Sequence, residues 1–298
     1  MRFRLDKVDW KALSENRRLK FDVGLAVVLI LFFAFFIDII YSICRFKYYK
    51  EERPREKAAI SQPVKKQPAV IRTTRKAAAV VAIILDDAGG SIPDYAGIRS
   101  IKEPLTVSIL PHLPGSLSIA RQLKDAGIEI MLHMPMEADN GSYTKRDGGM
   151  IITSASDDEI KKEVLDDFSS VKWAVGFNNH MGSKATKDER VMRDVFESVK
   201  HKGVFFIDSR TSGSSIAMRI AKSIGMRSAE NNVFLDGGTS EADIEGRFRQ
   251  LISMARWRGS AIGIGHATRR SMISVLKRLM PEYAKDGIKF VYASELAK

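Results

Sequence analysis

Acidic and imidazole side chains follow directly after short apolar runs along this 298-residue chain. Carboxylates and imidazoles bind metal ions, transfer protons and activate water, so their placement points to an enzyme. Buried parallel strands read as continuous apolar runs, and in barrels of such strands the active-site groups lie at the carboxyl ends. We therefore expect several strands to deliver these groups to one rim. The polar groups are Asp86-Asp87, His133, Asn178-Asn179-His180, Asp208-Ser209-Arg210-Thr211, Asp236 and His266.

Asp86 and Asp87 are consecutive, so we expect their side chains to point to opposite sides of a strand end. One carboxylate would then bind a cation while the other handles a proton. The alternative is that the pair caps a helix or stabilises a turn. His133 and His180 end two other apolar runs. Two imidazoles and one carboxylate would leave an open coordination position for water on Zn²⁺.

Stretches with helical spacing alternate with the apolar runs. The stretch after Ser156 has Glu159 three residues on, which is a capping-box pattern. Several others end next to a glycine, which is a stop signal for a helix. The predicted helices are Ser116–Asp125, Asp157–Ser170, Lys187–Lys202, Ser215–Ser223, Ser240–Arg258 and Thr268–Lys285.

Alternation of strand and helix, repeated about seven times, predicts an α/β fold with a parallel sheet. A (β/α) barrel and an open doubly wound sheet both fit this number of repeats. No dinucleotide fingerprint or P-loop follows the first strand. Because the Asp- and His-ended runs are spread over the whole domain, we expect a closed or nearly closed (β/α) barrel of about seven strands rather than an open sheet.

The formal charge of +12 is concentrated at the amino-terminal end of the chain. Residues 1–76 contain 18 Lys/Arg and 8 Asp/Glu, whereas residues 77–298 contain 30 and 28. The nearly neutral remainder has no helix-turn-helix, RNP or zinc-finger pattern, so we expect no binding to nucleic acid. Cys44 is the only cysteine, which excludes an intramolecular disulfide and a thiolate metal cluster.

The 22-residue segment Val23–Cys44 is apolar apart from Asp38. Because about 20 apolar residues cross a bilayer, we expect one transmembrane helix. A cleaved signal peptide is the alternative, but no A-x-A site follows the segment, and interfacial aromatic residues do. Equal numbers of Lys/Arg flank the segment, so charge does not orient it. The expected organisation is a short basic tail (1–22), a membrane anchor (23–44), a charged, proline-containing linker (45–76) and a barrel domain (77–298).

Six sequence motifs, in this order, resemble the divergent polysaccharide deacetylase family. The resemblance covers roughly Val80–Leu296. That family is related to the NodB-type carbohydrate esterases, which have an incomplete (β/α) barrel, so the resemblance implies this fold and a glycan substrate. The motifs are ILDDAGG, LHMPMEA, GFNNHMGS, FFIDSRT, VFLD and IGHA.

The resemblance implies that Asp86 is the catalytic base and Asp87 a metal ligand. The H-x-x-x-H metal motif of the classical enzymes is absent, so His133 and His180 would supply the imidazoles from separate strands. Asn231-Asn232 stands where an Arg-Asp pair commonly precedes VFLD in the family.

Three further roles are predicted for this site. His266 would protonate the leaving amine. Asp208 would orient His266 or a ligand imidazole, as carboxylates behind metal ligands do. Arg210 would contact hydroxyl or anionic groups of a glycan. The alternative for Asp208 and Arg210 is an internal ion pair that holds the rim.

We therefore expect a single-pass protein of the inner (cytoplasmic) membrane with an extracytoplasmic, metal-dependent deacetylase domain. The cofactor would be a divalent metal, zinc by its ligands, and the substrate an N-acetylated amino sugar of an envelope glycan such as peptidoglycan. One alternative is a catalytically inactive glycan-binding or scaffold protein on the same barrel. Another is a metal hydrolase that acts on a phosphoester or a peptide. The sequence predicts no oligomeric state.

Overall fold

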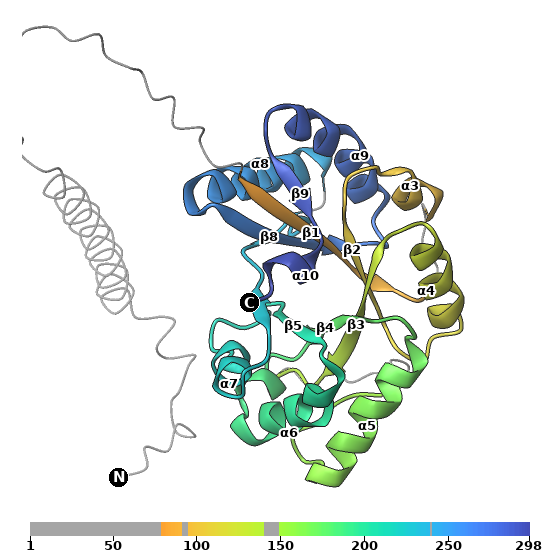
Figure 1. The fold of residues 1–298 in the computed structure, drawn as a ribbon, viewed down its shortest axis with the longest axis vertical. Helices are drawn as coiled ribbons and strands as arrows, with labels where there is room; N and C mark the ends of the chain where they lie inside the picture. The colour runs from red at the N-terminus through yellow and green to blue at the C-terminus, as the bar shows by residue number, and fades with distance from the viewer. Residues whose placement is uncertain (1–78, 91–94, 140–148, 239) are drawn as a thin grey trace, which may run out of the picture. The chain divides into compact units, whose positions relative to one another are not determined.

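The computed structural model describes residues 79–298 apart from 91–94, 140–148 and 239 (Figure 1). The predicted tail, the segment Val23–Cys44 and the linker lie outside the described residues. Within the described part, no helix has both the length and the apolar character needed to cross a membrane. Residues Thr73–Lys298 form one compact unit.

The described strands form one sheet in which every pairing is parallel. Its order is β6-β5-β4-β3-β2-β1-β8-β7, and β9 pairs with β1 off this path. The parallel α/β architecture is as predicted, and it is consistent with a (β/α) barrel. The strands are β1 (Val80–Ala88), β2 (Thr106–Ile109), β3 (Glu129–Met136), β4 (Gly176–Met181), β5 (Phe205–Asp208), β6 (Ser228–Glu230), β7 (Val233–Phe234), β8 (Ser260–His266) and β9 (Lys289–Val291).

One short segment bonds to both ends of this sheet. The backbone N–H of Asn231 donates to the carbonyl of Asp208, 2.8 Å away in β5. The next residue, Asn232, donates its N–H to the carbonyl of Ile262 in β8 at 2.9 Å. Strand β6 pairs with β5, and β7 pairs with β8, so the two short strands together occupy the position between β5 and β8. Asn231 and Asn232 lie where the hydrogen bonding changes from β5 to β8. The sequence predicted about seven strands, and the described sheet has nine. The prediction was too low because this segment forms two short strands and because β9 was not predicted.

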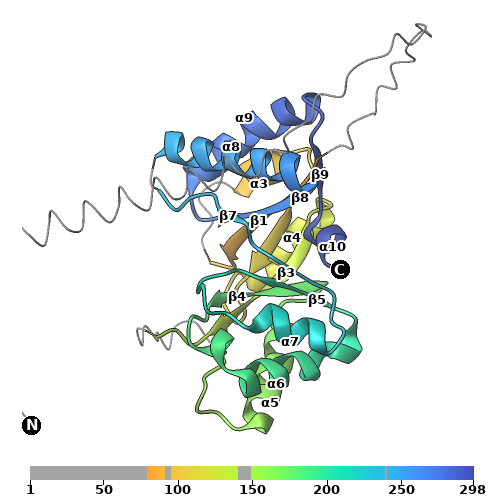
Figure 2. The ribbon, with the colours of Figure 1, turned by 90° about the vertical axis from the view of Figure 1, so that its left-hand side faces the viewer.

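Helices surround the strands, as Figures 1 and 2 show. All six predicted helices are present, most with ends within two residues of the prediction. Ser156 and Ser240 begin α5 and α8 with capping boxes, which satisfy backbone N–H groups at the helix start. The helices are α3 (Tyr95–Ser100), α4 (Ser116–Asp125), α5 (Asp157–Ser170), α6 (Glu189–Val199), α7 (Ala217–Ser223), α8 (Glu241–Arg258), α9 (Arg270–Lys285) and α10 (Ala293–Leu296), with short 3₁₀ turns at Ala185–Lys187 and Lys200–Lys202.

Side chains alternate between two hydrophobic clusters along the strands, as the period of two requires. In β1, Val81 and Ile83 belong to the large cluster that also includes the buried faces of the helices. Ala82 and Ile84 belong to the smaller cluster between the strands. Asp86 continues this inner row at the carboxyl end of β1. The fold therefore places Asp86 directly above an apolar interior.

Helix α10 contributes to the same inner cluster at the opposite end of the strands. Ala293 of this helix and Ala297, directly after it, are buried there. The N–H of Ala293 donates to the hydroxyl of Thr106, the first residue of β2, at 3.0 Å. Lys298 exchanges backbone hydrogen bonds with Ser228 at the start of β6. The C-terminal residues therefore cover the amino end of the barrel interior.

We expect opposite stability changes from alanine at two glycines. A Cβ at Gly176 in β4 would lie 2.6 Å from ring atoms of the fully buried Phe205, so Gly176→Ala should destabilise the fold by about 1–3 kcal/mol. Gly246 lies in the exposed middle of α8, with no atom within 4 Å of an added Cβ. Gly246→Ala should stabilise the fold by about 0.5–1 kcal/mol. Urea unfolding of both variants measures this, and equal shifts would contradict the packing described.

Candidate functional site

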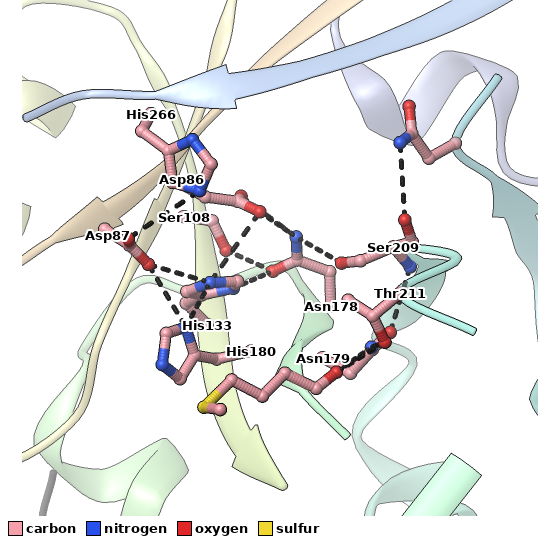
Figure 3. A network of polar contacts seen from close by, with 12 residues as sticks. Asp86, Asp87, Ser108, His133, Asn178, Asn179, His180, Ser209, Thr211 and His266 are labelled. Carbon is pink, nitrogen blue, oxygen red and sulfur yellow. Dashed lines mark hydrogen bonds and ion pairs between the residues drawn. The ribbon is translucent and has the colours of Figure 1, made fainter. Parts of the chain in front are cut away.

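Five of the predicted site residues meet at the carboxyl end of the sheet (Figure 3). Strand β1 supplies Asp86 and Asp87, β3 supplies His133, β4 supplies His180 and β8 supplies His266. These strands are neighbours in the order β4-β3-β2-β1-β8. The carboxyl ends of parallel strands thus gather residues that are far apart in sequence.

Asp86 and Asp87 both reach the imidazole of His133, contrary to the expectation that they point to opposite sides. Asp86 Oδ2 lies 3.7 Å from His133 Nε2, and Asp87 Oδ1 lies 3.2 Å from the same nitrogen. The reason is the backbone: Asp87 has φ of 62°, and the pairing of β1 with β2 is irregular between Leu85 and Ala88. Aspartate tolerates this left-handed conformation better than most residues, at a cost of about 1–3 kcal/mol.

Three potential ligand atoms form a nearly equilateral triangle. Asp87 Oδ1 lies 3.2 Å from His133 Nε2 and 3.1 Å from His180 Nδ1, and the two nitrogens are 3.1 Å apart. Tetrahedral ligands at about 2.0–2.1 Å from a zinc ion would be separated by about 3.3 Å. Among the described residues, the buried Asp87 Oδ1 accepts no hydrogen bond of good geometry. This donor set therefore fits a divalent metal such as zinc.

The side chain of Asn178 fixes which nitrogen of His133 is available to a metal. Asn178 Oδ1 lies 2.8 Å from His133 Nδ1, and an amide oxygen can only accept. Nδ1 therefore carries a proton, and Nε2 faces Asp87 and His180. Orientation of a ligand imidazole by a polar partner behind it is typical of metal sites.

Asn178 also binds the neighbouring groups of the site. Its Nδ2 donates to both carboxylate oxygens of Asp86, at 2.9 and 3.1 Å, and lies 3.1 Å from the hydroxyl oxygen of Ser209. The hydroxyl of Ser108 donates to Asn178 Oδ1. All these groups are buried. Sequence reasoning gave Asn178 no role, although it lies two residues before His180 and so on the same face of β4.

The two adjacent carboxyl groups have pKa values shifted in opposite directions. Burial raises the pKa of Asp86 above its usual value, and His133 and Asn178 offset this only in part. Burial also acts to raise the pKa of Asp87, but the hydrogen-bonding and charge interactions with His133 and His180 outweigh it and lower that pKa. Asp87 is therefore suited to be an ionised ligand, and Asp86 to accept a proton.

Two carboxylates raise the pKa of the His133 imidazole. Burial lowers its pKa, but the charges of Asp86 and Asp87 outweigh burial and raise the pKa to about 9. Because Nδ1 keeps its proton toward Asn178, a cation that binds Nε2 must displace the other proton.

His266 is held by Asp236, which lies two residues after the end of β7. His266 Nδ1 lies 3.0 Å from each carboxylate oxygen of Asp236, and the backbone N–H of His266 donates to Asp236 Oδ2 at 2.9 Å. The hydrogen bond to Asp236 raises the pKa of His266. His266 Nε2 lies 3.8 Å from Asp87 Oδ2. This arrangement suits a proton donor beside the potential metal ligands.

Asp208 does not contact His266 or a ligand imidazole, unlike the role predicted for it. The buried Asp208 accepts hydrogen bonds from the Ser215 hydroxyl and from the backbone N–H of Arg210, both at 2.7 Å. The guanidinium of Arg210 lies 3.7 Å from Glu230. No described hydrogen bond or ion pair joins Asp208 or Arg210 to an imidazole of the site. The structure thus places Asp236, rather than Asp208, on His266.

The turn that contains Asp208 and Arg210 still supports the site through Ser209. The Ser209 N–H donates to Asn179 Oδ1 at 2.9 Å, and its hydroxyl oxygen lies next to the Asn178 amide. Arg210 adopts φ of 58° in this turn. Asp208 therefore holds the turn that places Ser209 behind the site.

Comparisons with known proteins give one matching family model and two relatives. The family model described as divergent polysaccharide deacetylase matches residues 83–297. An uncharacterized protein of Haemophilus influenzae is 37% identical over 205 residues, which cover 68% of this chain and 72% of that protein. The uncharacterized protein YibQ of Escherichia coli is 32% identical over 219 residues, which cover 72% of this chain and 66% of YibQ.

A solved structure supports the fold. The crystal structure of an uncharacterized protein from Agrobacterium tumefaciens superimposes with a TM-score of 0.70 at 22% sequence identity. The match covers 74% of this chain and 89% of that one.

We expect the unit Thr73–Lys298 to bind one zinc ion tightly and to lose thermal stability when a chelator removes it. Asn178→Ala should lower the affinity for zinc by about 10- to 100-fold, because His133 loses the partner that orients it. His180→Ala, which removes a ligand, should weaken binding further. Isothermal titration calorimetry and elemental analysis measure affinity and stoichiometry.

The matched control for the metal experiment is His112→Ala. His112 lies outside the site, where its Nε2 is 3.0 Å from Asp167 Oδ1, and it belongs to another group of potential ligands with Glu163 and Asp166. If His112→Ala removed the zinc and His180→Ala did not, the ion would belong to that other group.

Proposed function

Because the chain belongs to the divergent polysaccharide deacetylase family, we propose that it hydrolyses the acetamide of an N-acetylated amino sugar in an envelope glycan. The observation that carries the proposal is the convergence of three potential metal ligands with a separate carboxylate and a separate imidazole. The ligands are Asp87, His133 and His180, the carboxylate is Asp86 and the imidazole is His266.

A divalent metal held by Asp87, His133 and His180 would supply an activated water and polarise the acetyl carbonyl. Asp86 takes the proton that the attacking water releases. Its raised pKa suits this role, because a carboxyl group of higher pKa is a stronger base when ionised. The amide of Asn178 binds both oxygens of Asp86 and so fixes their orientation.

His266 protonates the amine as the carbon–nitrogen bond breaks, so that water and amide become acetate and free amino sugar. Asp236 holds Nδ1 of His266 and leaves Nε2 facing the carboxylate of Asp87. By raising the pKa of His266, Asp236 favours the protonated imidazole that the step needs.

The exposure of the site suits a polymeric substrate. The side chains of Asp87, His180 and His266 are 25%, 21% and 34% exposed, whereas those of Asp86 and His133 are buried. A sugar could thus approach from solvent while the base remains protected. We assign Arg210, 35% exposed beside the Ser209 turn, to contacts with glycan hydroxyl or anionic groups.

We further propose that Val23–Cys44 anchors the chain in the inner membrane, with the catalytic domain on the extracytoplasmic side. The support is the length and apolar character of this segment, together with the location of envelope glycans outside the cytoplasm.

A second candidate is a catalytically inactive protein that binds a glycan or acts as a scaffold. The observation that favours it is the absence of the H-x-x-x-H pattern, since the two imidazoles come from separate strands. Binding of glycan without release of acetate would support this candidate and contradict ours.

We expect the zinc-loaded enzyme to release acetate from N-acetylglucosamine oligomers or peptidoglycan fragments. Asp86→Asn should lower kcat by about 10²- to 10⁴-fold while zinc stays bound, because it removes the base and no ligand. Asp158→Asn, at an exposed carboxylate in the first turn of α5, is the matched control and should retain full activity. Turnover of phosphoesters or peptides, but not of acetylated sugars, would assign the site to another hydrolase class.

Asp236 and His266 should behave as one unit. Asp236→Asn and His266→Ala should each lower kcat by about 10²-fold or more, and the double variant should be little worse than His266→Ala. Steady-state kinetics of the single and double variants measure this. Fully additive losses would show that Asp236 acts independently of His266.

A further inference from the structure

Large apolar side chains are exposed mainly at the end of the barrel opposite to the site. Four such side chains are found among the described residues. Trp173 and Val175 lie shortly before β4, Trp257 lies in the last turn of α8 before β8, and Leu117 lies at the start of α4. Because all strands are parallel, the segments that precede them lie at one end of the sheet. Trp257 is 80% exposed and Trp173 40%.

Exposed basic residues also lie at this end of the barrel. We call the exposed residues that precede or begin the strands the amino-end face. Exposed acidic groups at this end are fewer, and one of them, Asp286, is paired with Arg256. None of the described ion pairs involves Lys172, Lys202, Arg227 or Arg258. The basic residues of the amino-end face include Lys102, Lys172, Lys202, Arg227, Arg258 and Lys289.

Each exposed tryptophan carries a cation at its ring. Lys124 Nζ lies 5.6 Å from the centroid of the Trp173 ring, and the Arg258 guanidinium lies 5.5 Å from that of Trp257. An indole beside a basic group suits the headgroup region of a bilayer, where the ring lies at the interface and the cation meets phosphate.

We propose that the amino-end face binds the surface of an anionic lipid bilayer. The excess of positive charge complements anionic headgroups, and each basic residue near such a surface contributes to binding. The two tryptophans precede strands that are separated in the sheet, β4 and β8, and basic residues accompany both. This dispersed pattern fits many separate headgroups better than a protein partner, whose binding energy concentrates in one apolar cluster.

The position of the chain ends supports this orientation. Val80 begins β1 at the same end, so the chain that includes Val23–Cys44 joins the barrel there. Helix α10 covers the barrel interior at this end. The amino-end face would orient the domain, with the catalytic site turned away from the lipid.

The experiment uses Thr73–Lys298, which forms a compact unit with a large hydrophobic core among its described residues. This proposal is independent of the hydrolytic activity and of the anchor, because the unit lacks Val23–Cys44. We expect the unit to cosediment with phosphatidylcholine vesicles that contain phosphatidylglycerol, and not with pure phosphatidylcholine vesicles. Added salt should weaken binding, and tryptophan emission should shift to shorter wavelength on binding.

Two variants test the face directly. Lys202→Gln with Arg258→Gln should lower the partition coefficient by roughly 30-fold, since each charge contributes roughly fivefold. Trp257→Ala should reduce vesicle binding and should remove most of the wavelength shift in tryptophan emission. Each variant is checked for an unchanged circular dichroism spectrum and zinc content.

Matched controls lie at the other end of the barrel. Lys161→Gln with Lys162→Gln in the first half of α5, and Leu117→Ala at the start of α4, should leave vesicle binding unchanged. Equal losses in these controls, or no binding to phosphatidylglycerol vesicles at low salt, would overturn the proposal. If the unit did not bind vesicles, a protein partner would become the candidate for this face. That result would not affect the assignment of the hydrolytic site.

Discussion

The arrangement of the site depends on the side-chain amide of Asn178, which has an acceptor at one end and a donor at the other. Its oxygen faces His133 and its nitrogen faces Asp86. The reverse orientation would place the amide oxygen against a carboxylate and leave buried groups without partners, at a cost of about 1–3 kcal/mol for each. One uncharged residue therefore determines which nitrogen of His133 is free and where the oxygens of Asp86 point.

The sequence predicted the elements with strong local signals. Helix α5 was predicted with its observed ends because a capping box marks its start, and β1 because its apolar run is long. Strands β2, β6 and β9 were missed. They have only four, three and three residues, and β2 and β6 include buried serines in place of an apolar run. Short strands of this kind are specified by their neighbours rather than by their own composition.

The sequence also predicted which residues gather at the rim, but not how they pair. Asp208 and Asp236 both end apolar runs, and only strand order separates their roles. β7 pairs with β8 and so brings Asp236 to His266, whereas β5 lies between β4 and β6. The left-handed backbone conformation of Asp87 could not be predicted from the sequence either. It accompanies an irregular pairing of β1 with β2, and no local motif marks it.

The split segment of β6 and β7 has a consequence for the catalytic centre. These strands have only three and two residues, so few backbone hydrogen bonds hold them in the sheet. Asn231, between them, donates from Nδ2 to the carbonyl of Ser209 at 3.3 Å. Ser209 in turn contacts Asn178. Movement of this segment would shift Ser209 and, through it, the Asn178 amide that orients the His133 imidazole. A substitution at Asn231, which is not one of the potential ligands, would therefore lower activity.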